Sequence, residues 1–411
     1  MYKRFIFDVL KLRMQSAPVM LLVGPRQCGK TTLAQLLGKE LDMAYVSFDD
    51  ISTMAMAQFD PIGFVKNQPK PVIIDEAQRA PELFLPIKVD VDKDRQPGRY
   101  LLTGSANPLL APKLGDALTG RIGICNLWPL SQGELRGSRE TFIDRLLSDE
   151  PWQGNYQSMP QSEIINLVAL GGFPAIHTAS SEKERQDWCN DYLFNMLQKD
   201  VNELSKIEHF SQMPALFYGL ANRVGSTLNV DELSRLIHAS SSTVRRYMQL
   251  LQNLFLLYKL PAWNKNNDKK LVKSPKVYFS DTAFLLHTLG IDEQKVATIP
   301  NVLGHMIENF VVMEVVKQAT WSQTTPTLYH YRQEKEKGTE VDLVLETRSG
   351  KICGIEIKMA DMVRGNDLKG LTALKEQAGE AFHCGIVLYT GNQLLRFGDS
   401  FWGIPLRALW S

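Results

Sequence analysis

The sequence has few cysteines, almost no net charge and no long apolar run, and each absence excludes a class of protein. Its five cysteines lie far apart and form no Cys-x-x-Cys pair, so we expect neither a disulfide framework nor a zinc cluster. The net charge of +1 predicts no partner, so affinity for nucleic acid would have to come from a local basic patch. No run of about eighteen apolar residues occurs, and charges interrupt the N-terminal segment, so neither a membrane span nor a signal peptide is expected. We therefore expect a reduced, cytoplasmic protein with no membrane partner.

The chain is nevertheless rich enough in apolar residues to fold into several domains. It has 411 residues, of which 44% are hydrophobic and 22% are charged. These values are typical of a globular protein, and the length predicts two to four domains.

A glycine-rich segment carries the strongest functional signal. Residues 24–31, GPRQCGKT, match the pattern G-x-x-x-x-G-K-[ST]. The preceding VMLLV is typical of a buried parallel strand, and leucines follow at helical spacing. The amide groups of such a loop bind phosphates, its lysine reaches the β- and γ-phosphates, and its threonine binds Mg²⁺. ATP and Mg²⁺ are thus the expected cofactors, and the predicted nucleotide-binding residues are Gly24, Pro25, Arg26, Gln27, Cys28, Gly29, Lys30, Thr31 and Thr32.

Two further apolar segments end in polar residues that suit the same site. PVIIDEAQ is a predicted strand that ends at Asp75 and Glu76. Asp75 can bind the Mg²⁺ through water, and Glu76 can polarise the attacking water. The alternative is a strand that ends in two solvated carboxylates. RYLLTGSAN is a third predicted strand, and Ser105 and Asn107 follow it.

At this point the chain resembles the AAA+ ATPases. The resemblance implies a sensor residue that contacts both the γ-phosphate and the attacking water, which we assign to Ser105, with Asn107 as the second choice. It also implies an arginine that acts on a neighbouring subunit's nucleotide, for which Arg121 in ALTGRIG is the candidate. Such a role would require a homo-oligomer. The alternative for Arg121 is a surface or salt-bridged arginine.

The middle of the chain predicts helices followed by a basic module. Residues 171–176, GGFPAI, are interpreted as a hinge after the ATPase core. Residues 228–260 have the pattern of a helix-turn-helix, and a β-hairpin wing is expected after it. The stretch from Arg245 to Lys276 is rich in lysine and arginine and holds one acidic residue, Asp268. This excess predicts DNA as a partner, whereas the alternative is a winged helix that only packs between domains. The predicted DNA contacts are Arg245, Arg246, Lys269 and Lys270.

The last third contains a predicted hairpin with acidic residues on facing strands. If Glu346 pairs with Ile352, then Asp342 lies opposite Glu356, with their Cβ atoms about 5 Å apart. Two carboxylates this close favour a bound cation, and oxygen ligands suit Mg²⁺ or Mn²⁺. Glu308 on a preceding helix can supply a further acid. Lys358 would stabilise the transition state at a scissile phosphate.

This order of elements, with Asp342, Glu356 and Lys358, resembles the PD-(D/E)xK nuclease superfamily, although Val341 replaces the proline. The motifs together resemble prokaryotic ATPases of the AAA_14/DUF4143 type. The resemblance implies an α/β fold with a P-loop NTPase core at 1–175, a helical and winged-helix region at 176–275, and a restriction-endonuclease-like domain at 276–411.

Three functions are consistent with these motifs. The favoured one is an ATP-hydrolysing protein that binds or acts on DNA. The second is a regulatory ATPase switch whose C-terminal domain is a non-cleaving interaction module. The third is a nuclease with a vestigial ATPase, against which the intact Lys30, Asp75 and Glu76 argue.

Overall fold

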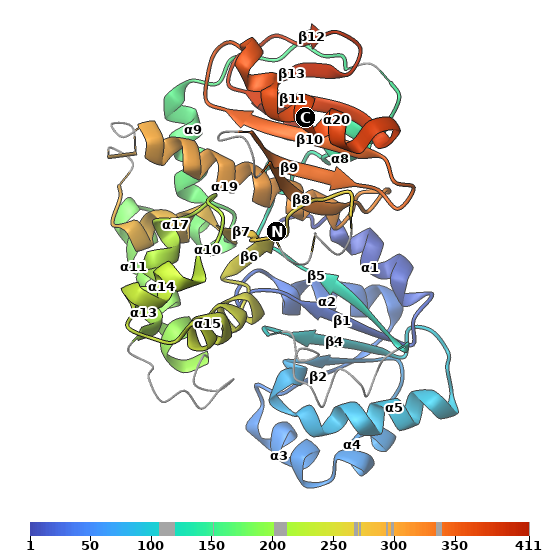
Figure 1. The fold of residues 1–411 in the computed structure, drawn as a ribbon. Coiled ribbons are helices and arrows are strands. Elements are labelled where there is room, and N and C mark those ends of the chain that lie inside the picture. The colour runs from blue at the N-terminus through green and yellow to red at the C-terminus, as the bar shows by residue number, and fades with distance from the viewer. Residues whose placement is uncertain are drawn as a thin grey trace. The chain divides into compact units, whose positions relative to one another are not determined.

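The computed structural model forms two compact units (Figure 1). It describes residues 1–106, 120–150, 152–200, 212–266, 270, 273–292, 295–296, 300–333 and 339–410. The first unit comprises residues 1–130 and 253–255, and the second comprises 131–252 and 256–411. The segment 131–175, which the sequence places in the ATPase domain, therefore belongs to the second unit. None of the helices within the described ranges is long and apolar enough to cross a membrane.

The first unit is built on a parallel sheet with the strand order β2-β3-β4-β1-β5. Its strands are β1 (Val19–Val23), β2 (Ala44–Ser47), β3 (Val72–Asp75), β4 (Tyr100–Gly104) and β5 (Ile122–Asn126). Its helices are α1 (Ile6–Met14), α2 (Lys30–Leu41), α3 (Ile51–Phe59), α4 (Pro61–Asn67) and α5 (Phe84–Lys93). All residues of β1 are buried, because neighbouring strands flank it on both sides and helices cover the sheet. The continuous apolar runs of the sequence become the inner strands, as expected for a parallel sheet.

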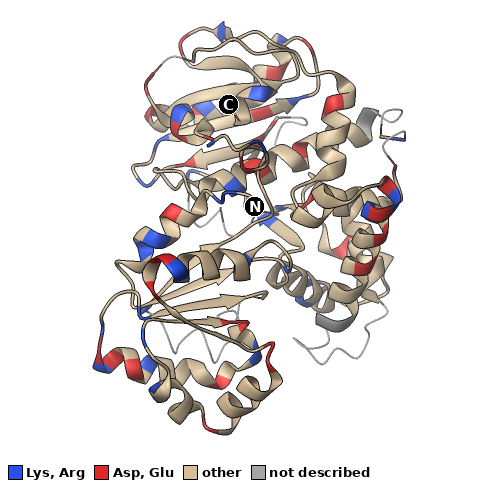
Figure 2. Ribbon diagram, turned by 180° about the vertical axis from the view of Figure 1, so that it is seen from behind, with Lys and Arg blue, Asp and Glu red and all other residues tan. Residues whose placement is uncertain are grey.

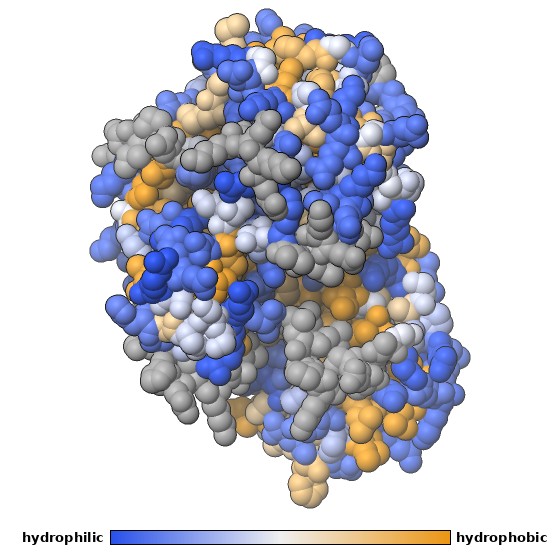
Figure 3. Space-filling view, viewed as in Figure 1, coloured by the Kyte–Doolittle hydropathy of each residue, from blue (hydrophilic) through white to orange (hydrophobic). Residues whose placement is uncertain are grey.

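Apolar side chains also lie on the surface of the first unit. Ile51, Met56, Phe59 and Ile62 on α3 and α4 are 74%, 65%, 92% and 70% exposed. Figure 3 shows apolar surface at the bottom of the view, where Figure 1 places α3 and α4.

The second unit begins with helices. They are α7 (Gln132–Arg136), α8 (Phe142–Leu147), α9 (Gln161–Leu170), α10 (Pro174–Thr178), α11 (Glu182–Asn195), α13 (Gln212–Ala221), α14 (Val230–Leu236), α15 (Ser241–Asn253), α17 (Thr282–Leu289) and α19 (Pro300–Ala319), with a π-helical turn, η4, at Met196–Asp200. Strands β6 (Leu257–Leu260) and β7 (Lys276–Phe279) form an antiparallel pair after α15.

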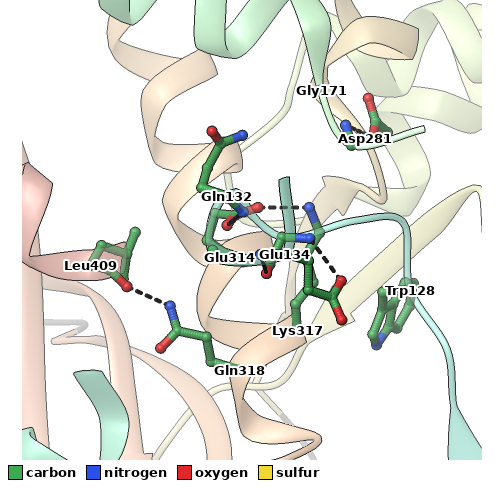
Figure 4. A network of polar contacts seen from close by, with 12 residues as sticks. Trp128, Gln132, Glu134, Gly171, Asp281, Glu314, Lys317, Gln318 and Leu409 are labelled. Atoms are coloured by element: carbon green, nitrogen blue, oxygen red, sulfur yellow. Dashed lines mark hydrogen bonds and ion pairs between the residues drawn. The ribbon is translucent and has the colours of Figure 1, made fainter. Parts of the chain in front are cut away.

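Buried polar contacts bind the start of the second unit to α19 (Figure 4). The amide of Gln132 donates to Glu314 Oε2 at 2.8 Å, and Lys317 pairs with Glu314 at 2.7 Å. Gln318 donates to the carbonyl of Leu409 at 2.6 Å. Because α19 holds both ends of this unit, the domain boundary falls earlier than the sequence suggested.

The GGFPAI segment is a buried packing element of this unit, so its interpretation as a hinge is wrong. The amide of Gly172 donates to Asp281 Oδ2 at 2.8 Å, and a Cβ at Gly171 would lie 1.8 Å from Asp281 Oδ1. The Phe173 ring packs against Tyr192 and Phe284, with centroids 5.3 and 4.8 Å away. Glycine is required here for close approach of the backbone rather than for flexibility.

A six-stranded mixed sheet completes the second unit, in the order β12-β13-β11-β10-β9-β8. The strands are β8 (Thr327–Arg332), β9 (Glu340–Glu346), β10 (Ile352–Lys358), β11 (Phe382–Tyr389), β12 (Leu395–Phe397) and β13 (Phe401–Pro405). Helix α20 (Lys369–Ala378) packs on the sheet through Leu371 and Leu374. The predicted succession of a helix and three strands before α20 is therefore present.

Candidate functional site

The phosphate-binding pattern folds into a loop between β1 and α2. Gln27 and Gly29 have left-handed φ angles of 59° and 101°, which turn the chain into the helix. A Cβ at Gly24 would lie only 2.0 Å from the carbonyl oxygen of Leu127, so that position excludes any other residue. Arg4 fastens the loop by donating to the carbonyl of Cys28 at 2.7 Å. The loop thus has the backbone form that presents amide groups to an anion.

Lys30 is buried and bonded to its own loop. Its Nζ donates to the carbonyls of Gly24 and Pro25 at 3.0 and 2.8 Å. Reaching a phosphate requires the ammonium group to leave these carbonyls. Cys28 is buried beside it, and burial raises the pKa of its thiol, so this cysteine is not a reactive nucleophile.

Three hydroxyl groups surround the carboxylate of Asp75. Thr31 Oγ1 and Tyr45 OH donate to Oδ2 at 2.9 and 2.8 Å, and Thr103 donates to Oδ1. The loop threonine and the strand-end aspartate therefore meet, as the sequence predicts. A threonine hydroxyl next to a carboxylate is the donor set by which P-loop proteins hold Mg²⁺. Tyr45 and Thr103 carry no motif and were not identified from the sequence.

Glu76 lies directly after Asp75 in a left-handed conformation, with a φ angle of 57°. Ser105 Oγ is 3.3 Å from Glu76 Oε2, so the predicted sensor serine and the predicted base lie together. Gln78 links them, because its Nε2 donates to Ser105 Oγ at 3.0 Å and also to Glu76 Oε2. Gln78 was not identified from the sequence, although its position two residues after Glu76 is a signal that it lies near the same site.

The structure places Arg121 in an ion pair within its own unit. Its Nε and Nη2 donate to the two carboxylate oxygens of Asp92 at 2.5 and 3.0 Å. This bidentate contact lowers the pKa of Asp92. The arrangement matches the salt-bridged alternative considered for Arg121. The second sensor candidate, Asn107, lies outside the described residues.

A second polar cluster lies in the C-terminal sheet. Strands β9 and β10 pair with Glu346 opposite Ile352 and Leu343 opposite Ile355, which is the register assumed from the sequence. One residue beyond the last pair, this register sets Asp342 across from Glu356. Both carboxylates are buried, with residue exposures of 6% and 7%. Asp342 Oδ2 accepts from the amide of Ile357 at 3.0 Å.

Lys276 and Tyr278 on β7 enter this cluster, although no sequence motif indicated them. Lys276 Nζ lies 3.0 Å from Glu308 Oε1 and 3.3 Å from Asp342 Oδ1. Tyr278 OH donates to Glu308 Oε1 at 2.8 Å. Burial raises the pKa of Glu308 to about 7, to which the neighbouring Asp342 contributes. Lys276 ends the basic stretch that predicts DNA contact, and for this residue the prediction is wrong, because its side chain is buried among these acids.

Glu356 has one oxygen that remains unbonded. Its Oε1 pairs with Lys358 at 2.7 Å, whereas Oε2 is buried without a hydrogen-bond partner. Burial, followed by the charge of Asp342, raises the pKa of Glu356 to about 8. A buried acceptor without a donor is costly, and a bound cation would relieve that cost.

The predicted DNA contacts separate into different environments. Arg245 and Arg246 are exposed on α15, whose opposite face buries Val244 and Tyr247. Lys270 instead pairs with Glu346 at 2.6 Å and lies over the Tyr329 ring. Lys269 lies outside the described residues. Figure 2 shows basic residues interspersed with acidic ones along the ribbon.

Protein-family comparisons match three successive segments of the chain. An AAA domain matches residues 16–136 and therefore covers the P-loop, Asp75 and Glu76. Two domains of unknown function follow, DUF8612 at residues 161–295 and DUF4143 at residues 303–409. The first unit is thus an AAA-type domain, and the acidic cluster draws residues from both of the other matches.

Curated relatives span most of the chain. Uncharacterized protein Rv2008c of Mycobacterium tuberculosis is 31% identical over 350 residues, which are 85% of this chain and 72% of that protein. Uncharacterized protein MJ1544 of Methanocaldococcus jannaschii is 19% identical over 92% of this chain and 84% of its own length.

Solved structures give weaker likenesses. The Walker-type ATPase PABY2304 of Pyrococcus abyssi is 12% identical, with a TM-score of 0.44, over 70% of this chain and 96% of its own. The RuvB Holliday junction branch migration motor of Thermotoga maritima is 20% identical, with a TM-score of 0.28, over 62% and 86%. The assignment of the first unit as an AAA-type domain rests on the AAA-domain match and on the geometry of the phosphate-binding loop.

Proposed function

Because the chain belongs to the family of the mycobacterial protein Rv2008c, and because its first unit is an AAA-type domain, we propose that it binds ATP with Mg²⁺ and hydrolyses it. One observation carries the proposal: Thr31 Oγ1 lies 2.9 Å from Asp75 Oδ2. The two motifs are 44 residues apart in the chain, and a nucleotide site is the function that requires them in contact.

Each residue of the site has a role that follows from its position. The amides of the loop and the Lys30 ammonium would bind the phosphates. Thr31 would hold Mg²⁺ directly and Asp75 through water, and the ion would neutralise phosphate charge. Glu76 would orient the attacking water, and Gln78 and Ser105 keep its carboxylate in place.

The first prediction tests Glu76 as the residue that polarises water. Glu76→Gln keeps the shape of the side chain and removes its charge. We expect ATP hydrolysis to fall about 100-fold or more while ATP still binds, since general-base catalysis contributes roughly 10²–10⁴-fold. Steady-state phosphate release and equilibrium binding of a labelled ATP measure the two quantities.

Glu82→Gln provides the matched control, because Glu82 is exposed and follows the same strand. Unchanged hydrolysis by Glu76→Gln would remove Glu76 from the mechanism.

The acidic cluster supports a second function, metal-dependent cleavage of nucleic acid. The supporting observation is the unbonded Oε2 of Glu356 next to Asp342. Carboxylate oxygens suit Mg²⁺ or Mn²⁺, which would activate water and neutralise a scissile phosphate, and Lys358 is placed beside them. Glu308 suits such an ion less, because Lys276 and Tyr278 already bond to it. In this proposal Asp342 and Glu356 hold the metal, and Arg245 and Arg246 contact the DNA backbone.

The second prediction separates this function from a regulatory switch. Wild type and Asp342→Ala are compared on single-stranded, duplex and branched DNA with Mn²⁺, with the exposed Asp361→Ala as the control. Cleavage that is lost only in Asp342→Ala supports a nuclease. Identical product patterns in all three proteins would assign any cutting to contamination and favour a non-cleaving interaction module.

A further inference from the structure

Cys353 meets the adjacent residues His383 and Cys384 in the C-terminal sheet. Cys353 on β10 and Cys384 on β11 have their Sγ atoms 3.6 Å apart. One ligand atom from each of Cys353, His383 and Cys384 lies within 4.8 Å of the other two. Cys353 and Cys384 are buried, and the His383 side chain is 17% exposed. These are three residues of metal-binding type around one point.

A β-bulge brings the histidine to the cysteines. In the parallel pairing of β10 with β11, Ile352 lies opposite Phe382, whereas Cys353 lies opposite Cys384. His383 is therefore an extra residue in β11. In a regular strand His383 and Cys384 would point to opposite faces, because side chains alternate. The bulge removes this alternation locally, and bulges commonly redirect a side chain at a functional site.

The surroundings of His383 resemble the second shell of a metal ligand. Its Nε2 lies 3.0 Å from the carbonyl oxygen of Ser148, and a hydrogen bond there requires Nε2–H to be the donor. The Nδ1 lone pair is then available to a cation. Metal-binding histidines generally donate their other ring N–H to a carbonyl or carboxylate in this way.

An exposed carboxylate, that of Asp149, lies on the Nδ1 side of the same ring. Asp149 Oδ1 is 3.8 Å from His383 Nδ1 and 3.2 Å from Lys351 Nζ, and the Asp149 side chain is 87% exposed, so it is free to turn toward a cation. Thiolate, imidazole and carboxylate are each ligands that tetrahedral Zn²⁺ accepts.

We propose that Cys353, His383 and Cys384, with Asp149 as the fourth ligand, bind a thiophilic divalent cation, namely Zn²⁺. Zinc–sulfur bonds of about 2.3 Å in a tetrahedron separate two sulfurs by about 3.8 Å. The observed separation is 3.6 Å, whereas a disulfide requires about 2.05 Å. A disulfide would also give no role to the bulge at His383.

The site would connect the segment after α8 to two central strands of the sheet. Cys353 lies on β10 three residues before Glu356, and alternation directs these two side chains to opposite faces. The zinc site is therefore separate from the acidic cluster and has a structural role. The thiols of Cys384 and Cys353 donate to the carbonyl of Leu146 at 3.5 and 3.8 Å, so this segment already lies against the cysteines; metal binding would replace these two weak hydrogen bonds. The site could not be predicted from the sequence, because the two cysteines are 31 residues apart and only the pairing of β10 with β11 brings them together.

The test measures metal content and thiolate ligation in the full chain. Purified protein is analysed for zinc, then depleted with a chelator under reducing conditions and titrated with Co²⁺. We expect about one zinc per chain, thiolate-to-cobalt charge-transfer absorption and the visible bands of a tetrahedral site. Cys353→Ser and His383→Ala should lower the zinc content at least tenfold. Cys189→Ser, which removes another buried free cysteine, should leave it unchanged.

Two outcomes would overturn the proposal. One is cobalt binding without thiolate absorption in wild-type protein. The other is a Cys353–Cys384 disulfide in protein that takes up no zinc. The wild-type cobalt spectrum decides the matter even if a variant fails to fold. ATP hydrolysis by His383→Ala should remain at the wild-type level, which separates this inference from the proposed ATPase.

Discussion

At the scale of single residues, several buried polar side chains in the second unit are held by backbone groups of another segment. Asn309 on α19 accepts from the amide of Phe279 at 2.7 Å and donates to its carbonyl at 2.9 Å. His330 on β8 is 1% exposed, and its Nε2 lies 3.1 Å from the carbonyl of Ser274. The His330 Nδ1 is buried without a partner. The bonded atoms, the Asn309 amide and His330 Nε2, favour one arrangement of the chain, because other arrangements leave them unbonded.

The third prediction concerns the pH dependence of stability through His330. Burial, with the charge of Lys276, lowers the pKa of this imidazole to about 4. The unfolded chain therefore takes up the proton first, near its ordinary pKa of about 6.5. Stability should fall as the pH drops from about 6.5 toward 4, at up to about 1.4 kcal/mol per pH unit. Urea unfolding followed by tryptophan fluorescence across this range measures the slope.

His330→Gln cannot titrate and should show a smaller slope in that window. The exposed His238→Asn should keep the wild-type slope, and asparagine tolerates the left-handed backbone of that position. Equal slopes in wild type and His330→Gln would show that another group controls the acid sensitivity.

At the scale of elements, the β9–β10 hairpin could be predicted from the sequence. The packing of β7 against α19 and the pairing of β10 with β11 could not. The register assumed for this hairpin, with Glu346 opposite Ile352, is the one that the structure has, and its continuation sets Asp342 across from Glu356. The approach of Lys276 to Glu308 depends on how β7 packs against α19, and no local pattern encodes that packing. The same limit applies to Cys353 and Cys384, which meet only because β10 pairs with β11.

The fourth prediction follows from the position of Lys276 between two buried acids. Lys276→Met removes the charge that neutralises Glu308 and Asp342. We expect a loss of about 3–5 kcal/mol in the free energy of unfolding, because breaking a buried ion pair leaves an uncompensated charge. Chemical denaturation near neutral pH measures the change.

Lys259→Met on the neighbouring strand β6 is the control, since Lys259 is exposed and should change stability little. A loss of less than about 1 kcal/mol in Lys276→Met would show that the acids are neutralised in another way.

At the scale of the whole molecule, the order of the motifs was predictable and the division of the chain was not. The P-loop, the strand ending at Asp75 and the helix–strand order of the C-terminal region are local patterns, and the structure has them all. The boundary at Leu130 depends on contacts such as that of Gln132 with Glu314, which are 182 residues apart. Composition does not change at this point, so the sequence placed the boundary at the next glycine-rich segment, 171–176.

The central claim is that the AAA-type domain binds and turns over ATP, and Lys30 tests it most directly. Lys30→Ala removes the ammonium group and leaves the amides of the loop. The decisive measurement is ATP hydrolysis at saturating Mg²⁺, together with equilibrium ATP affinity, for wild type and Lys30→Ala in parallel. We predict Mg²⁺-dependent hydrolysis by wild type and a loss of at least about 100-fold in the variant, with weaker binding. Equal affinity and equal turnover in the two proteins would contradict the account.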